Sequence, residues 1–128
     1  MTHADATGII LFAHGSRDPL WRAPIDAVAL AIARQHPQMQ VRCAFLELTD
    51  PDLNTALTEL VGVGMQHIRI VPMFLGTGKH AREDLPELVC QLRERYPSIG
   101  IELLGPIGEH PDMIRQMAEI AAGQIHLI

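Results

Sequence analysis

The sequence carries few of the features that mark membrane, secreted or disulfide-bonded proteins. It has no apolar run near the ~18 residues that a transmembrane helix needs, and no basic segment precedes its first apolar stretch, as a secretory signal requires. Its two cysteines, Cys43 and Cys90, lie far apart in apolar surroundings and form no CxxC motif. We therefore expect a cytoplasmic protein with no membrane association and with reduced, buried thiols.

The sequence also lacks the motifs of nucleic-acid, nucleotide and hydrolase sites. Its formal net charge of −5 argues against a nucleic-acid surface, which needs a basic stripe. Gly78-Lys79 resembles the end of a P-loop, but His80 stands where serine or threonine is required. Ser16 has no G-x-S-x-G sequence around it, and H-E-x-x-H does not occur. Nucleotide use and hydrolysis therefore have little support.

Short apolar runs alternate with helical stretches along the chain. Runs typical of buried strands occupy 8–13, 41–46, 68–73 and 99–104, and apolar residues at helical spacing predict helices at 22–35, 53–61, 84–96 and 110–121. This order predicts an α/β fold with a parallel sheet covered on both faces. We expect one domain over residues 1–128, with an ordered core at about 8–122 and loose tails at 1–7 and 123–128.

Capping residues predict where three of the helices begin. Asp50-Pro51 has the form of an N-cap followed by proline at the first helical position. Asp84-Leu85-Pro86-Glu87 matches a capping box, which makes 75–83 a loop. His110-Pro111 opens the last helix, whose methionines are expected in the core: Met113 and Met117.

Residues able to bind metals or anions follow each strand, at the edge where open parallel sheets form their sites. In chain order they are His14 and Arg17, Glu47, Lys79, His80, Arg82 and Glu83, and then Glu109 and His110. With the strands in the order 2-1-3-4, the first and third are neighbours, so that His14 and His80 would face one cavity. Imidazole and carboxylate suit a divalent metal such as cobalt, nickel, iron or zinc. We predict that His14 and His80 bind a metal.

Three cations share these loops on an otherwise acidic chain: Arg17, Lys79 and Arg82. Because arginine can bind carboxylates in bidentate fashion, the cluster predicts an anionic ligand. Phe74 and Leu75 would supply an apolar wall beside Met73. Histidines, cations and an apolar wall together fit a flat, acidic ligand that binds metal.

Structural roles stay open for the same residues. The alternatives are a turn residue at His14, an exposed loop residue at His80, a solvated carboxylate at Glu47 and a helix cap at His110. The other histidines are given no role: His3, His36, His67 and His126.

Several short motifs follow one another along the chain from about residue 9 to residue 122. They are Ala13-His14-Gly15-Ser16-Arg17, Phe45-Leu46-Glu47 with Pro51, Pro72-Met73-Phe74-Leu75 with Gly78-Lys79-His80 and Asp84-Leu85-Pro86, and Gly105-Pro106-Ile107-Gly108 with His110-Pro111. Each motif is weak alone, but the ordered set resembles the short sirohydrochlorin chelatases of the CbiX/SirB type.

This resemblance implies a three-layer α/β/α fold with a four-stranded parallel sheet in the order 2-1-3-4. It implies an ATP-independent lyase, a homodimer, that inserts a divalent metal into sirohydrochlorin during cobalamin or sirohaem synthesis. Co²⁺ is the expected metal, with Fe²⁺ and Ni²⁺ as alternatives, and no cofactor is expected besides this metal substrate. The family's catalytic residues fall on His14, His80 and Glu47. Many longer members carry a histidine-rich segment, whereas this chain has only His126 at its tail.

Three other classes of protein compete with this interpretation. A non-catalytic metal or tetrapyrrole carrier would bind Co²⁺ stoichiometrically without turnover. A phosphoryl-transfer domain of the response-regulator kind would need an acidic pocket after the first strand, where this chain has Ala13-His14-Gly15. A plain interaction module would not need the cationic loops.

Overall fold

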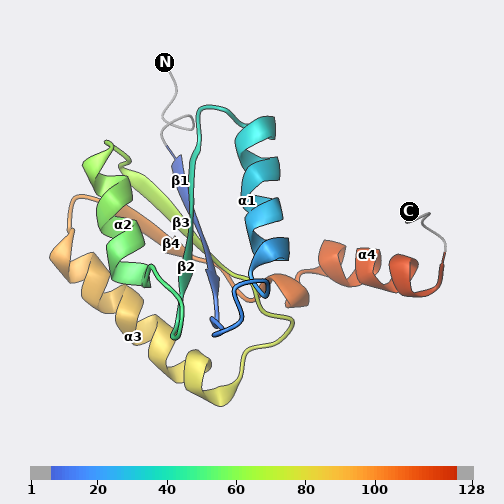
Figure 1. Cartoon of the computed structure of the whole chain (residues 1–128). Helices are drawn as coiled ribbons and strands as arrows, with labels where there is room; N and C mark the ends of the chain where they lie inside the picture. Colours follow the sequence, from blue (N-terminus) through green and yellow to red (C-terminus); the bar gives the residue numbers. More distant parts are fainter. Residues whose placement is uncertain (1–6, 124–128) are drawn as a thin grey trace.

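The computed structural model describes residues 7–123, except for the side chain of His80. Strands and helices alternate along the chain, as predicted (Figure 1). In order they are β1 (Thr7–Ala13), α1 (Ala23–Gln35), β2 (Gln40–Phe45), α2 (Leu53–Gly62), β3 (His67–Pro72), α3 (Lys79–Arg95), β4 (Gly100–Leu103), a 3-10 turn at Ile107–Glu109, and α4 (Pro111–Ala121). The tails predicted at 1–7 and 123–128 lie outside the described residues, apart from Gly123 and from Thr7, which is buried in β1.

The four strands form one parallel sheet in the predicted order β2-β1-β3-β4. Because residues alternate between the faces of a strand, the apolar run of β1 supplies both faces. Ile10 and Phe12 pack against buried residues of α2 and α3. Ile9 and Leu11 form a second cluster with residues of α1. Helices thus cover both faces, and all carboxyl ends of the strands meet at one edge of the sheet.

The N-cap of α2 lies two residues after the predicted one. Asp52, not Asp50, is the N-cap, and its side chain accepts a 2.8 Å hydrogen bond from the Thr55 N–H. Pro51 lies outside the helix, where its carbonyl accepts the N–H of Phe45 at 2.9 Å. The prediction failed because this tie to the end of β2 takes Pro51 away from the first helical turn.

The helix α3 begins at Lys79 and contains Pro86, so the predicted capping box is wrong and the loop predicted at 75–83 ends at Gly78. Proline inside a helix removes one main-chain hydrogen bond, a cost that tertiary packing must offset. Four residues at helical spacing provide that packing, each at most 5% exposed: Ala81, Leu85, Val89 and Leu92. This apolar stripe starts before the proline and carries the helix back to Lys79.

The last helix, α4, begins as predicted at His110-Pro111 but projects away from the sheet (Figure 1). None of its residues is buried, so the expectation that Met113 and Met117 belong to the core is wrong. The expectation of two buried thiols also fails, because Cys43 is half-buried and Cys90 is exposed. Within residues 7–123, no helix is both long and apolar enough to cross a membrane.

Candidate metal-handling site at the carboxyl edge of the sheet

His14 follows the last residue of β1 and lies exposed against an aromatic support. Its imidazole stacks on the ring of Phe74, with centroids 4.4 Å apart and an angle of 28° between the planes. Phe74 is only 4% exposed and meets Phe12 edge-on at 6.2 Å. The buried phenyl ring therefore fixes one face of the imidazole, while the rest of the ring stays accessible to a ligand.

Glu47 is held beside His14 by the main chain. Its N–H donates to the His14 carbonyl at 3.0 Å, one residue beyond the bond from the Leu46 N–H to the Ala13 carbonyl. Gly15 makes this contact possible because it has φ +102°, and a Cβ there would collide with the Glu47 carbonyl oxygen. The Glu47 side chain is exposed, so both a catalytic role and that of a solvated carboxylate remain compatible with its position.

The first turn of α3 carries the predicted cations. Lys79 and Arg82 are exposed on this turn, and the Arg82 N–H donates to the carbonyl of the N-cap residue Gly78 at 2.9 Å. Since β3 pairs directly with β1, this turn follows the strand next to the one that precedes His14. His80 belongs to the same turn, but its side chain lies outside the described part of the structure. Its pairing with His14 therefore stays a prediction.

The remaining predicted residues are the apolar Phe74 and Leu75 and the cation Arg17. Leu75 is 74% exposed next to the buried Phe74, and Arg17 is exposed on the loop after His14. Gly108 packs against the main chain of Leu75, where a Cβ would collide, and its N–H donates to the Phe74 carbonyl at 2.9 Å. Phe74 and Leu75 are thus pinned by the loop after β4.

His110 has the structural role left open from the sequence. Its Nδ1 accepts the N–H of Asp112 at 3.1 Å and caps α4. Its neighbour Glu109 is exposed, and both residues help to line an apolar cavity of about 320 Å³. Among the described side chains, no three histidine, cysteine, aspartate or glutamate groups come close enough to hold a metal. Any metal at His14 would therefore need a further ligand, such as the predicted His80 or the substrate itself.

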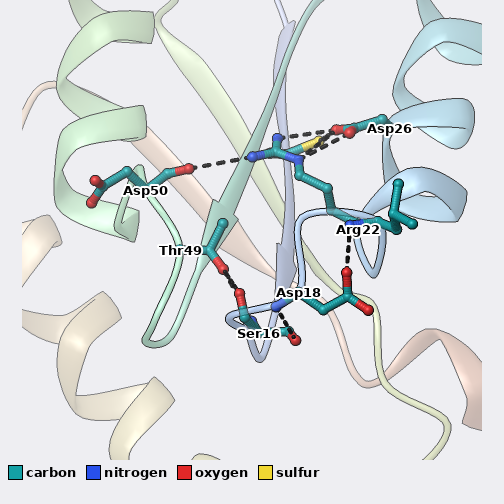
Figure 2. A network of polar contacts seen from close by, with 8 residues as sticks. Ser16, Asp18, Arg22, Asp26, Thr49 and Asp50 are labelled. Carbon is teal, nitrogen blue, oxygen red and sulfur yellow. Dashed lines mark hydrogen bonds and ion pairs between the residues drawn. The ribbon is translucent and has the colours of Figure 1, made fainter.

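A polar network that the sequence analysis missed joins the two loops around His14 (Figure 2). The Thr49 hydroxyl accepts the Ser16 N–H at 3.0 Å and donates to the Ser16 carbonyl at 2.8 Å. Arg22 binds Asp26 at 2.9 Å, and its guanidinium also donates to the Asp50 carbonyl at 3.4 Å. No sequence motif predicts this network, because Arg22 and Asp50 lie 28 residues apart and Ser16 and Thr49 lie 33 residues apart.

The half-buried thiol of Cys43 adjoins the same network. Burial raises its pKa, and the nearby Asp26 carboxylate raises it further. The thiol therefore stays protonated near neutral pH and lies 3.6 Å from an oxygen of Asp26. A protonated thiol is a poor metal ligand, so Cys43 has a structural role.

Comparison with known proteins bears out the family resemblance. The family model of CbiX matches residues 8–122. The sirohydrochlorin cobaltochelatase of Methanococcoides burtonii is 36% identical over 86 residues, 67% of this chain and 66% of that protein. The sirohydrochlorin ferrochelatase of Bacillus subtilis is 35% identical over 109 residues, 84% of this chain and 41% of that protein. The matches thus span less than two thirds of these two curated relatives.

Solved structures agree with the sequence comparison. The crystal structure of a CbiX protein from Marinobacter aquaeolei superposes with a TM-score of 0.79 at 29% identity, covering 92% of this chain and 96% of that one. The chain therefore belongs to the CbiX family.

Proposed function

We propose that this protein is a sirohydrochlorin chelatase, a lyase that inserts a divalent metal into the macrocycle without ATP. The observation that carries the proposal is the exposed imidazole of His14, which stacks on Phe74 at the carboxyl edge of the sheet, after the strand that pairs with β3. The named activities of the relatives from Methanococcoides burtonii and Bacillus subtilis support the same reaction.

Sirohydrochlorin is a flat macrocycle edged by carboxylates, and the site offers matching charges. Arg17, Lys79 and Arg82 are exposed in segments that follow β1 and β3, and they would bind some of these carboxylates. The N-terminus of α3 adds the positive end of the helix dipole. The exposed apolar side chain of Leu75 would lie along the face of the ring.

Insertion replaces the water around the metal and releases two protons from pyrrole nitrogens. Neutral His14 and His80 would hold the metal through their ring nitrogens and, once the metal has passed to the macrocycle and these lone pairs are free, would accept the two protons. Glu47, tied to His14 through the main chain, would pass protons on to solvent. The metal is the substrate, no further cofactor takes part, and an incomplete ligand set suits a metal that must leave.

Cobalt is the proposed metal, with iron and nickel as alternatives. One curated relative is a cobaltochelatase and another a ferrochelatase. The ligand types at this edge do not separate these ions, because imidazole and carboxylate bind all three. Initial rates with Co²⁺, Fe²⁺ and Ni²⁺ at equal free concentration would rank them, and an Fe²⁺ rate above the Co²⁺ rate would shift the proposal from cobalamin to sirohaem synthesis.

The test of the reaction follows the absorbance of sirohydrochlorin after mixing with protein and Co²⁺. His14→Ala and His80→Ala should each slow turnover about 10²-fold or more, as expected for acid–base or ligand groups. His36→Ala is the matched control, because His36 is exposed at the end of α1 and should leave the rate unchanged. Wild-type rates in both site variants would overturn the assignment, and stoichiometric binding without turnover would indicate a carrier instead.

The uncovered helix α4 supports a homodimer as the active form, and we propose the cytoplasm as its location. Met113, Met117 and Ile120 lie at helical spacing on one face of α4, and Ile120 is 41% exposed. A second copy would bury this face, so sedimentation should give a dimer for the wild type and a monomer for Met117→Glu. A monomeric wild type would contradict the proposal, and Ala118→Glu, which adds the same single charge at an exposed position of this helix, serves as the charge control.

A further inference from the structure

One threonine hydroxyl connects the loop that carries His14 with the loop that carries Glu47. Thr49 Oγ1 uses both main-chain groups of Ser16, accepting from the N–H at 3.0 Å and donating to the carbonyl at 2.8 Å (Figure 2). Ser16 lies two residues beyond His14, and Thr49 lies two residues beyond Glu47. The Glu47 N–H donates to the His14 carbonyl at 3.0 Å. The segment 47–49 is therefore bonded to the first loop at both of its ends, through Glu47 and through Thr49.

The segment between those two attachments has an unfavourable main-chain conformation. Leu48 has φ +65°, a value in the left-handed region that bulky side chains rarely adopt. Its side chain is 55% exposed, so burial of leucine does not hold this conformation. Such a conformation persists only where the surroundings enforce it, and the bonds of Glu47 and Thr49 on either side do so.

The base of the Glu47 loop has its own attachments. Arg22 donates to the Asp50 carbonyl at 3.4 Å and lies over the ring of Phe45, 4.6 Å from its centroid. The Phe45 N–H donates to the Pro51 carbonyl at 2.9 Å. Loss of the Thr49 hydroxyl would therefore release Leu48 and Thr49, while the base of the loop and the main-chain bond of Glu47 to His14 stay in place.

We propose that Thr49 is a positioning residue for metal insertion, which fixes the orientation of the Glu47 side chain relative to the loop that carries His14. This inference rests on the proposed function of the site. Thr49 acts through Ser16 and touches neither metal nor macrocycle. Small misplacements of reacting groups reduce rates strongly. Removal of the Thr49 hydroxyl should therefore lower the turnover rate strongly, although it removes only two hydrogen bonds from the folded protein.

Two substitutions at Thr49 separate positioning from plain stability. Thr49→Val keeps the shape of the side chain and removes both hydrogen bonds, and Thr49→Ser keeps the hydroxyl. In the Co²⁺ insertion assay, kcat/KM for the metal should fall about tenfold to hundredfold in the valine variant and should stay within about threefold of wild type in the serine variant.

The matched control is Thr58→Val on α2, which loses one threonine hydrogen bond, 2.8 Å to the Tyr96 hydroxyl, away from both loops. It should lose stability in urea as Thr49→Val does and keep the wild-type insertion rate. Should Thr49→Val not fold, Thr49→Ala removes the hydroxyl without placing a methyl group against the Ser16 main chain. Wild-type kcat/KM in the valine or alanine variant, or serine as slow as valine, would overturn the proposal.

A second readout does not depend on insertion. Co²⁺ is paramagnetic, so metal near His14 broadens the NMR signals of its imidazole. Broadening at a given Co²⁺ concentration should be weaker in Thr49→Val than in wild type and restored in Thr49→Ser. If the wild type inserts no metal, the proposed function fails, but the NMR measurement still tests the positioning role of Thr49. Equal broadening in all three proteins would overturn that role.

Discussion

Gly15 is the position where one added methyl group should disturb the site most. It has φ +102°, and a Cβ would meet the carbonyl oxygen of Glu47. An L-residue in left-handed conformation costs about 1–2 kcal/mol. The collision would also push the loops apart and break the three hydrogen bonds of Glu47 and Thr49 to the first loop, each worth about 1 kcal/mol. Gly15→Ala should therefore destabilise the fold by about 4–5 kcal/mol.

Two control glycines separate the conformational part of this cost from the steric part. Gly64 also has a positive φ, +93°, but its Cβ would meet nothing within 4 Å, so Gly64→Ala should cost only about 1–2 kcal/mol. The Cβ of Gly76 would likewise meet nothing within 4 Å, and its φ is ordinary. Gly76→Ala should therefore stay within about 0.5 kcal/mol of wild type.

The assay is urea unfolding followed by circular dichroism for wild type and the three variants. The expected order of stability is Gly76→Ala, Gly64→Ala and then Gly15→Ala, with about 3 kcal/mol between the last two. Since domains of this kind are stable by about 5–15 kcal/mol, Gly15→Ala would lie near the limit of folding. Equal losses in Gly15→Ala and Gly64→Ala would show that the two loops do not meet at Gly15, and would refute the described geometry.

Three further predictions concern the core, a helix cap and the thiols. Leu57→Ala removes a side chain with no exposed surface and should cost about 2–5 kcal/mol in urea unfolding; a loss under 1 kcal/mol would contradict the packing of α2 on the sheet. Asp52→Ala removes the cap of α2 and should cost about 1 kcal/mol at pH 7. The Thr55 N–H lowers the pKa of Asp52 below its ordinary 3.8, so this difference should be complete above pH 3.8 and shrink as the pH falls through the lowered pKa; an equal difference at pH 2.5 and pH 7 would contradict the cap. A thiol reagent at pH 7.5 should label the exposed Cys90 quickly and Cys43 slowly, because burial raises the pKa of Cys43; equal rates would contradict this.

The strands and their order could be predicted from the sequence because their apolar runs are short and separated by turn residues. The run from Gly8 to Ala13 is buried on both faces of the sheet, as such runs are in parallel sheets. The edge at which the strands end then fixed the place of His14 and Glu47. Both therefore follow from local patterns combined with one rule of topology.

Helix boundaries were harder because local signals compete with packing. The Asp84 to Glu87 segment has the form of a helix start, yet the buried Ala81 and Leu85 carry α3 across Pro86. Likewise, α4 has a regular apolar face, and nothing in that pattern tells whether its own sheet or another chain covers it. In both cases the deciding contacts are with residues remote in sequence.

The side-chain contacts of the site could not be predicted from the sequence for the same reason. The stacking of His14 on Phe74 and the bonds of Thr49 to Ser16 join residues 60 and 33 positions apart. The necessity of Gly15 also depends on Glu47, a residue of another loop. Sequence patterns identified the chemically competent residues, and tertiary contacts decided how they are held.

Binding of the metal substrate by His14 and His80 at the carboxyl edge of the sheet can be seen in a crystal soaked in Co²⁺. If this ligand pair is correct, anomalous diffraction should give a peak about 2.1 Å from a ring nitrogen of both histidines, a usual distance between imidazole and a divalent metal. A peak only at other side chains, such as the exposed Cys90, with none at His14, would contradict it.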